Sequence, residues 1–420
     1  MSYLNYKKEI GDTAWITALQ VLNYLIPLIV WPYLMKVLGA EQFGFFSFGF
    51  AVAQYLIIIV DFGFNLSATK QIALAKNNPQ EINRIFTATL CAKAGLLAVS
   101  FLILVVISLI PCYVIYRPVM LIMFLMTVSC TFFFVWLFQG LGKIRKISII
   151  NGLSKIAILP FVFLFVKSPQ DMLLAAVLQS CGYLLTAIVV VIYIHHHHYA
   201  SFCKIKTSDV REMLRQSTPL FVSTAASSVY TMLFIVIIAW FVTPDEVGKY
   251  SAADKLMRYS TVILWVPLSQ AFFPLISALS KDDFAKGRKI VRKLVIIVAC
   301  GALLLGGVLF FAAEPLCTLL GKGYSGMHLI TRIMSVLPLF IATGGIIGQL
   351  GIVALGDEKS KTMYRNIYIA AACLSVCLVI PLTNCFSSVG ASIAAVVTEC
   401  FVCISMIALY LSSVRKVQTA

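Results

Sequence analysis

Residues 38–51 read LGAEQFGFFSFGFA, and residues 242–255 read VTPDEVGKYSAADK. An acidic residue, a glycine and a serine occupy matching positions, first as Glu41, Gly44 and Ser47 and then as Asp245, Gly248 and Ser251. The separation of 204 positions, from Glu41 to Asp245, is close to half of the 420 residues. This repeated turn predicts that the chain consists of two similar halves in tandem.

The composition indicates a membrane protein. Of all residues 60% are hydrophobic and 12% are charged, which is too little charge to cover a soluble globule of this size. Apolar runs of about 20 residues, the length that crosses a hydrocarbon core of roughly 30 Å, recur along the chain. Twelve spans are predicted, at residues 12–36, 43–65, 85–111, 119–141, 147–167, 171–194, 217–242, 250–276, 294–320, 327–355, 363–385 and 388–413.

The repeat and the spans together predict the fold class. We expect an all-α integral membrane protein with twelve transmembrane helices in two tandem six-helix lobes, residues 1–205 and 206–420, around a central cleft. Because six is an even number, both halves enter the membrane from the same side. Transporters are often built from such repeats, with the substrate site at the interface between them.

The charged residues support this topology. The formal net charge is +16, but the position of the charges is more informative than their sum. Of the 33 Lys and Arg residues, 23 fall at the termini and in the loops of one side, and five fall in the loops of the other. The positive-inside rule therefore places both termini in the cytoplasm. The basic charge is explained by topology, and no nucleic-acid partner is expected.

A polar stripe precedes each repeated turn. Thr17, Gln20 and Tyr24 recur at helical spacing before the first turn, and matching positions before the second include Thr224 and Ser228. Two corresponding stripes favour the lining of a shared polar cleft. The alternative is that Ser and Thr hydroxyls bond to their own helix backbone and that small side chains help the helices to pack.

Nine ionisable side chains fall inside the predicted spans. The basic ones are Lys93, Lys155, Lys255, Arg258 and Arg332, and the acidic ones are Asp61, Asp254, Glu314 and Glu399. Such groups cost roughly 2.5–3.5 kcal/mol each at the membrane centre, so they normally face a cavity or a partner. At about 1.5 Å rise per residue, Lys155 and Glu399 lie roughly 12 Å and 16 Å deep.

Two interpretations of these charges stay open. Asp254 and Arg258 are four positions apart and can pair on one helix face, and the others can form ion pairs between helices. Alternatively, the excess of basic residues makes the cleft cationic. A cationic, hydroxyl-lined cleft suits an anionic, polar cargo such as a phosphate that carries sugars. The twelve Cys include Cys373/Cys377 and Cys400/Cys403 at helical spacing, which we interpret as packing residues and not as a metal site.

Several segments resemble the Wzx, or RfbX-type, O-antigen flippases, which are polysaccharide transporters of the multidrug/oligosaccharidyl-lipid/polysaccharide exporter superfamily. The resemblance lies in Leu25–Tyr55, in DFGFNLSATKQIA (61–73), in FFFVWLFQGLGKIRKIS (132–148) and in GKYSAADKLMRYS (248–260). It implies a bacterial inner-membrane flippase and not an enzyme. The implied activity moves undecaprenyl-pyrophosphate-linked oligosaccharide repeat units from the cytoplasmic to the periplasmic leaflet by alternating access.

The resemblance also implies roles for the charged residues. Lys93, Lys155, Lys255, Arg258 and Arg332 become candidate contacts of the anionic head group. Asp61, Asp254 and Glu399 become candidates for coupling to protons or sodium, or for structural pairing. No cofactor or metal is implied. The implied partners are the lipid-linked oligosaccharide, membrane lipid, and the O-antigen polymerase and chain-length regulator of the same pathway.

Alternative functions predict other features. A multidrug or small-cation exporter of the same superfamily would have a predominantly acidic cavity. An O-antigen polymerase would have a large periplasmic loop, and a membrane acyltransferase would need a His-centred site. The sequence shows none of these patterns.

Overall fold

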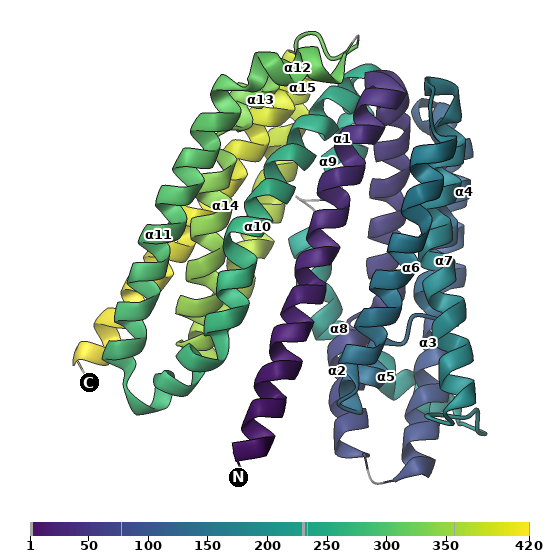
Figure 1. Ribbon diagram of the computed structural model, residues 1–420, viewed down its shortest axis with the longest axis vertical. Coiled ribbons are helices and arrows are strands. Elements are labelled where there is room, and N and C mark those ends of the chain that lie inside the picture. The colour runs from purple at the N-terminus through teal and green to yellow at the C-terminus, as the bar shows by residue number, and fades with distance from the viewer. Residues whose placement is uncertain are drawn as a thin grey trace. The chain divides into compact units, whose positions relative to one another are not determined.

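The computed structural model describes the backbone of residues 3–76, 78–228, 232, 234–321, 323–356 and 358–419. It describes the side chains of residues 26–76, 78–222, 224–225, 228, 232, 234–279, 283–321, 323–356 and 359–412. All regular secondary structure within the described backbone is helical (Figure 1). The predicted all-α class is confirmed.

The helices follow one another with short connections. In the first half they are α1 (Tyr3–Asp61), α2 (Phe64–Leu74), α3 (Pro79–Leu109), η1 (Pro111–Tyr116), α4 (Arg117–Thr131), α5 (Val135–Gly140), α6 (Ile144–Phe165), η2 (Pro169–Asp171), α7 (Met172–His196) and α8 (Thr207–Ser228). In the second half they are α9 (Phe234–Ile238), α10 (Pro244–Asp282), α11 (Phe284–Phe311), α12 (Ala313–Leu320), α13 (Met327–Met334), α14 (Leu337–Ile346), the π-helix η4 (Ile347–Ala354) and α15 (Glu358–Thr419).

Nine segments of the described chain are long and apolar enough to cross a membrane. Two of them, Ile26–Leu74 with 49 residues and Lys359–Ser412 with 54, are about twice the length of one span. Each overlaps two predicted spans, the first segment only from residue 26 onward, and each is kinked between them, at Gly39 in α1 and at Phe386 and Ser387 in α15. The predicted span 217–242 includes residues outside the described ranges, so the count of twelve spans stays a prediction.

The outer faces of the helices are apolar. Phe161 and Leu164 on α6 and Ile297 and Leu304 on α11 are exposed, and only 22% of the apolar window of each helix is buried. A continuous apolar surface of this kind is unfavourable in water and favourable against lipid tails. The protein is a multi-pass membrane protein.

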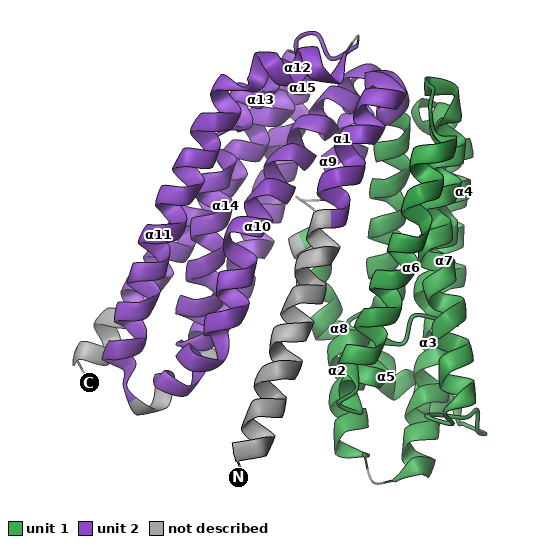
Figure 2. Cartoon of the chain, viewed as in Figure 1, with its two compact units in different colours: residues 1–23, 45–228 green, residues 24–44, 229–420 purple. Residues whose placement is uncertain are grey.

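The chain forms two compact units (Figure 2). Unit 1 comprises Met1–Asn23 and Phe45–Ser228, and unit 2 comprises Tyr24–Gly44 and Val229–Ala420. The core of unit 1 surrounds the fully buried Trp136, and that of unit 2 joins α10, α11, α14 and η4. The lobe boundary expected between residues 205 and 206 stays a prediction.

Helix α8 packs within unit 1. The hydroxyl groups of Ser67 on α2 and Ser217 on α8 are 2.6 Å apart and share a hydrogen bond. At the start of α8, Arg84 Nη2 donates to Asp209 Oδ1 over 2.7 Å. This hydrogen bond from Arg84 holds the pKa of the Asp209 carboxyl below its ordinary value. Both contacts hold α8 against α2 and α3.

The two repeated turns cross at their glycines. Gly44 and Gly248 approach so closely that a Cβ on Gly44 would overlap the carbonyl oxygen of Pro244, and a Cβ on Gly248 would overlap that of Ala40. Since backbone atoms cannot move aside as a flexible side chain can, both positions require glycine. This crossing gives a steric reason for the recurrence of the glycine in the two quoted stretches.

The residues after each glycine are also equivalent. Phe46 and Tyr250 are 0% and 1% exposed, and Ser47 and Ser251 are both fully buried. Neither serine hydroxyl has a hydrogen-bond partner within the described chain. The members of each pair thus have matching environments, and the tandem repeat inferred from the sequence stays a prediction.

We expect Gly248→Ala and Gly44→Ala to destabilise the fold, because the added methyl group meets backbone. Overpacking typically costs about 1–3 kcal/mol, and an immovable neighbour raises that cost. The measurement is the melting temperature and membrane yield of the purified variants. Gly307→Ala is the matched control, because nothing lies within 4 Å of its Cβ position. Wild-type melting of both crossing variants would contradict the steric explanation.

Candidate functional site

A sharp turn between α1 and α2 positions the first charged group. Phe62 and Gly63 have positive φ angles of 42° and 79°, so the helix stops directly after Asp61. A Cβ on Gly63 would lie 2.8 Å from the Leu220 side chain of α8. Glycine is therefore favoured both by its backbone conformation and by the close approach of α8. This turn is the DFGFN motif, and it leaves the Asp61 carboxylate at a helix end.

The Asp61 carboxylate is surrounded by donors. Lys93 Nζ on α3 lies 2.8 Å from Asp61 Oδ1, Asn65 Nδ2 donates to Asp61 Oδ2 over 3.1 Å, and the Cys130 thiol contacts Asp61 Oδ1 at 3.3 Å. Lys93 Nζ also donates to the Cys130 carbonyl oxygen over 3.1 Å, and its side chain is fully buried. Lys93 and Asp61 thus neutralise one another inside unit 1.

A polar pocket adjoins this ion pair. Its volume is about 190 Å³, and it lies among α1, α2, α4, α5, α6 and α7. Lys155 on α6 forms part of the pocket lining, and Lys155 Nζ lies 5.5 Å from the centre of the Tyr183 ring. The lining residues are Gln54, Ile57, Asp61, Asn65, Ser129, Cys130, Phe133, Val135, Asn151, Lys155, Tyr183 and Thr186.

In unit 2, two carboxylates share one guanidinium. Arg258 Nε lies 2.7 Å from Asp254 Oδ1, and Arg258 Nη1 lies 2.9 Å from Glu399 Oε1. The Asp254 and Glu399 side chains are 8% and 7% exposed. The pairing of Asp254 with Arg258 on one helix face is the arrangement that their spacing indicated. The contact with Glu399 links α10 to α15.

Lys255 lies beside aromatic rings. Its Nζ is 4.5 Å from the Trp31 ring centre and 5.9 Å from that of Phe43. Trp31 meets Phe43 edge to face and stacks on Tyr259. The ring faces stabilise the ammonium group by cation–π attraction. Lys255 is therefore enclosed within unit 2, with an exposed fraction of 6%.

Arg332 lies in a more open place. Its Nη2 is 2.8 Å from Glu314 Oε1, and the two side chains are 36% and 64% exposed. The guanidinium also lies 5.6 Å from the Phe310 ring centre. Because exposed pairs of this kind are weak, Glu314 holds Arg332 less firmly than buried carboxylates hold Lys93 and Arg258.

The predicted polar stripe is described only in part. Thr224 Oγ1 donates to the Leu220 carbonyl over 3.0 Å, and Ser228 Oγ donates to the Thr224 carbonyl over 2.8 Å. Both hydroxyls thus satisfy the backbone of their own helix. The side chains of Thr17, Gln20 and Tyr24 lie outside the described residues. The cleft-lining role of all five stays a prediction.

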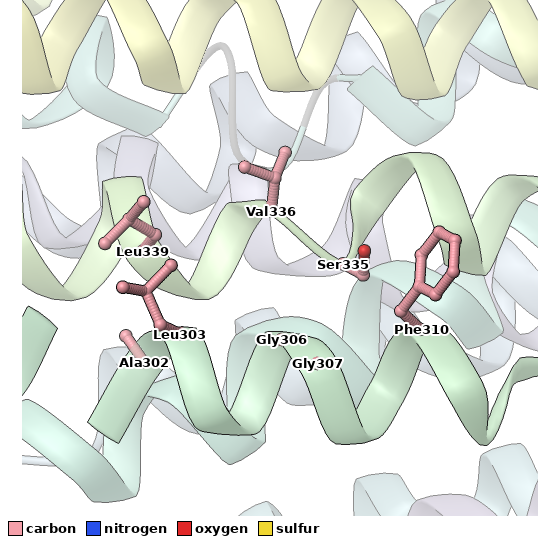
Figure 3. A pocket seen from close by; sticks show the side chains of 8 residues that line it. All are labelled: Ala302, Leu303, Gly306, Gly307, Phe310, Ser335, Val336 and Leu339. Carbon is pink, nitrogen blue, oxygen red and sulfur yellow. The ribbon is translucent and has the colours of Figure 1, made fainter. Parts of the chain in front are cut away.

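Unit 2 has a pocket of the opposite character (Figure 3). It measures about 230 Å³ and is lined by Ala302, Leu303, Gly306, Gly307, Phe310, Ser335, Val336 and Leu339. Its one side-chain polar group, the Ser335 hydroxyl, donates to the Arg332 carbonyl over 2.7 Å. The pocket therefore offers neither charge nor a spare hydrogen-bonding side chain, unlike the pocket around Lys155.

Several site residues were missed by reasoning from sequence. Asn151 is one of them, although it lies four positions before Lys155 in an apolar span, where the two share a helix face. Asn65 follows Asp61 by the same interval, and this spacing could have indicated it. No local signal links Lys93 to Asp61 or Arg258 to Glu399, because 32 and 141 residues separate the partners.

Apolar helices that enclose charged side chains define a polytopic membrane protein of the transporter class. Residues 10–280 match the family described as "Polysaccharide biosynthesis protein". This match covers more than half of the chain, and the chain belongs to that family. The resemblance drawn from the sequence motifs is thereby confirmed.

Two curated relatives share most of their length with this chain. A protein of Escherichia coli (strain K12) named "Putative O-antigen transporter" is 31% identical over 397 residues, which cover 93% of this chain and 94% of the relative. A protein of Shigella dysenteriae with the same name is 30% identical and covers 92% and 96%. Both relatives are named as transporters, in agreement with a chain that is a transporter and not an enzyme.

Solved structures share the fold at low identity. An inward-facing MATE multidrug resistance transporter of the MOP superfamily has a TM-score of 0.66 at 11% identity, with 94% of this chain and 98% of that chain covered. A lipid II flippase in an inward closed conformation has a TM-score of 0.55 at 13% identity, with 98% and 89% covered. These likenesses support the membrane-transporter fold and do not define the cargo.

We expect single substitutions in the Asp61–Lys93 pair to destabilise the protein and the double substitution to recover part of the loss. Removing one partner of a buried pair typically costs about 3–5 kcal/mol, because the other charge stays uncompensated. Asp61→Asn should cost more than Lys93→Met, because Lys93 is fully buried whereas Asp61 is 26% exposed.

The measurement is thermal unfolding of the two single variants and of Asp61→Asn/Lys93→Met. Arg215→Met is the control, because Arg215 pairs with Glu212 while 79% exposed and should change little. Additive losses in the double variant would show that the two charges are not coupled.

Proposed function

We propose that the protein translocates undecaprenyl-pyrophosphate-linked O-antigen repeat units from the cytoplasmic to the periplasmic leaflet of the bacterial inner membrane. Membership of the polysaccharide biosynthesis family and the names of the two relatives support a polysaccharide transporter. The finer statement, that the cargo is carried on a polyprenyl pyrophosphate, rests on the charge pattern inside the membrane-spanning helices.

The observation that carries this proposal is a cationic side chain at a polar pocket inside unit 1. Lys155 has no carboxylate partner among the described residues, and amide and hydroxyl groups surround it. A lipid-linked oligosaccharide combines negative phosphates with many hydroxyl groups, and both bind favourably to such a surface. Its polyprenyl chain can stay in the bilayer while the polar part passes through the protein.

The other basic residues differ in how readily they could contact the cargo. Lys93 and Arg258 are held by carboxylates, so either could contact the cargo only by exchanging an ion pair for a phosphate. Lys255 and Arg332 are candidates for further head-group contacts at separate places in unit 2. The aromatic surroundings of Lys255 also suit the apolar face of a sugar ring.

We propose that the acidic residues couple transport to an ion. Asp254 and Glu399 present two negative charges to the single guanidinium of Arg258. A proton or sodium ion at these carboxylates would offset the excess negative charge and weaken their ion pairs with Arg258. Such binding can drive a conformational change only through different affinities in the two states. Asp61 is the corresponding candidate in unit 1.

The direct test is translocation in liposomes. We expect liposomes that contain the purified protein to expose fluorescent undecaprenyl-pyrophosphate-linked repeat units at the outer leaflet faster than protein-free liposomes. The readout is the fraction of glycan cleaved by an added glycosidase over time, with and without a pH or sodium gradient. Equal rates with and without the protein, under every gradient, would refute the flippase proposal.

The charge distribution also predicts the orientation. In a variant without native cysteines, Ser201→Cys should react with a membrane-impermeant maleimide only after the inner membrane is opened, because the loop after α7 lies on the basic side. Gln170→Cys, which is exposed in the preceding loop, is the matched control and should react in intact spheroplasts. The reverse labelling would place both termini in the periplasm.

A further inference from the structure

Within the described chain, Lys155 differs from the other intramembrane cations in its contacts. Lys93 is paired with Asp61, Arg258 with Asp254 and Glu399, and Arg332 with Glu314. Lys255 lies against aromatic rings. Within the described chain no ion pair or hydrogen bond reaches Lys155, and its Nζ lies 5.5 Å from the centre of the Tyr183 ring.

The Asp61 carboxylate cannot neutralise Lys155 in addition to Lys93. Asp61 already accepts from Lys93, Asn65 and Cys130, and the charge of Lys93 balances that of Asp61. Lys155 therefore adds one positive charge to the pocket that no described acidic group offsets. An ammonium group shielded from water costs several kcal/mol unless an opposite charge reaches it. The pocket is suited to one negative charge.

The same pocket contains polar groups that suit a hydroxyl-bearing ligand. Asn65 Oδ1 is buried and has no hydrogen-bond partner among the described residues, so it can accept from a ligand hydroxyl. Asn151 lies one helical turn before Lys155 on α6 and can both donate and accept. Tyr183 and Gln54 also line the cavity, and the Tyr183 ring lies beside the ammonium group, 5.5 Å from Lys155 Nζ to the ring centre. A hydrogen-bond donor, a hydrogen-bond acceptor and an aromatic ring face thus line the same cavity.

The size of the cavity limits the ligand. Its volume of about 190 Å³ is below the roughly 300–1,000 Å³ of pockets that enclose drug-sized molecules. One sugar ring or one phosphoryl group with its neighbours fits this volume, and a whole repeat unit does not. The pocket therefore selects a part of the cargo.

We propose that this pocket is a subsite of unit 1 for one singly charged oxyanion borne on a hydroxyl-rich group, held by Lys155, Asn151 and Asn65. The inference rests on the proposed function for the identity of the cargo. Two parts of a lipid-linked oligosaccharide have this chemistry, namely the carboxylate of an acidic sugar and a phosphate of the lipid carrier. Binding at this pocket identifies the group that must enter unit 1 during translocation.

The test is calorimetric titration of the full-length protein in lipid nanodiscs with glucuronate, with methyl glucosyl phosphate as a singly charged phosphodiester, and with glucose. We expect the wild type to bind at least one of the two anions roughly tenfold or more tightly than glucose, as for a hydrogen bond to a charged group. Preference for glucuronate assigns the pocket to an acidic sugar, and preference for the phosphodiester assigns it to the carrier phosphate. Both results support the subsite.

Variants separate a binding role from a structural one. Lys155→Met should weaken anion binding about tenfold or more and leave the binding of glucose unchanged. Asn151→Asp keeps the shape of the side chain and places a carboxylate one turn before Lys155. This variant should raise the melting temperature and abolish anion binding, because the new carboxylate forms an ion pair with the Lys155 ammonium group. Lys167→Met, an equivalent change at an exposed position beyond the end of α6, is the control and should bind anions as the wild type does.

The outcomes of this test are independent of the flippase assay. A wild type that binds neither anion more tightly than glucose overturns the subsite, and so does undiminished anion binding in Lys155→Met or Asn151→Asp. In either case translocation in liposomes can still be observed. Conversely, anion binding that depends on Lys155, in a protein that moves no lipid-linked glycan, would retain the subsite and refute the proposed function.

Discussion

The cost of placing an ionisable group in hydrocarbon governs the interior of this protein. Opposite charges lie in contact there, in the Asp61–Lys93 pair of unit 1 and in the cluster of Asp254, Arg258 and Glu399 in unit 2. Each group joins helices that are distant in sequence, so the charges also determine how the helices pack. Lys155 departs from this pattern, because its charge faces a polar pocket and no described carboxylate.

Breaks in the helices make these charge contacts geometrically feasible. The turn at Phe62 and Gly63 ends α1 directly after Asp61, and α4 ends at Thr131, one residue after the Cys130 carbonyl that accepts from Lys93. The Cys130 carbonyl there accepts from both the Phe133 N–H, over 3.3 Å, and Lys93 Nζ, over 3.1 Å. The DFGFN stretch and the end of α4 therefore place irregular backbone where unit 1 holds its buried charge.

Much of the architecture could be predicted from the sequence, because it depends on local properties. Apolar length identified the membrane-spanning helices, and the repeated turn identified glycines whose necessity is explained by the Gly44–Gly248 crossing. The partners of the buried charges could not be predicted beyond Asp254 and Arg258, since nothing local connects Arg258 to Glu399. The pocket around Lys155 combines residues of six helices, so its composition depends on packing that one sequence does not specify.

The central claim is that Lys155 faces a polar pocket that receives the anionic part of the cargo. An electron cryomicroscopy structure of the protein in nanodiscs with a bound lipid-linked oligosaccharide tests it most directly. The account predicts density for a carboxylate or phosphate within about 3 Å of Lys155 Nζ, the range of a charge-assisted hydrogen bond. A Lys155 side chain that pairs with a protein carboxylate or projects into the acyl chains in that complex would contradict it.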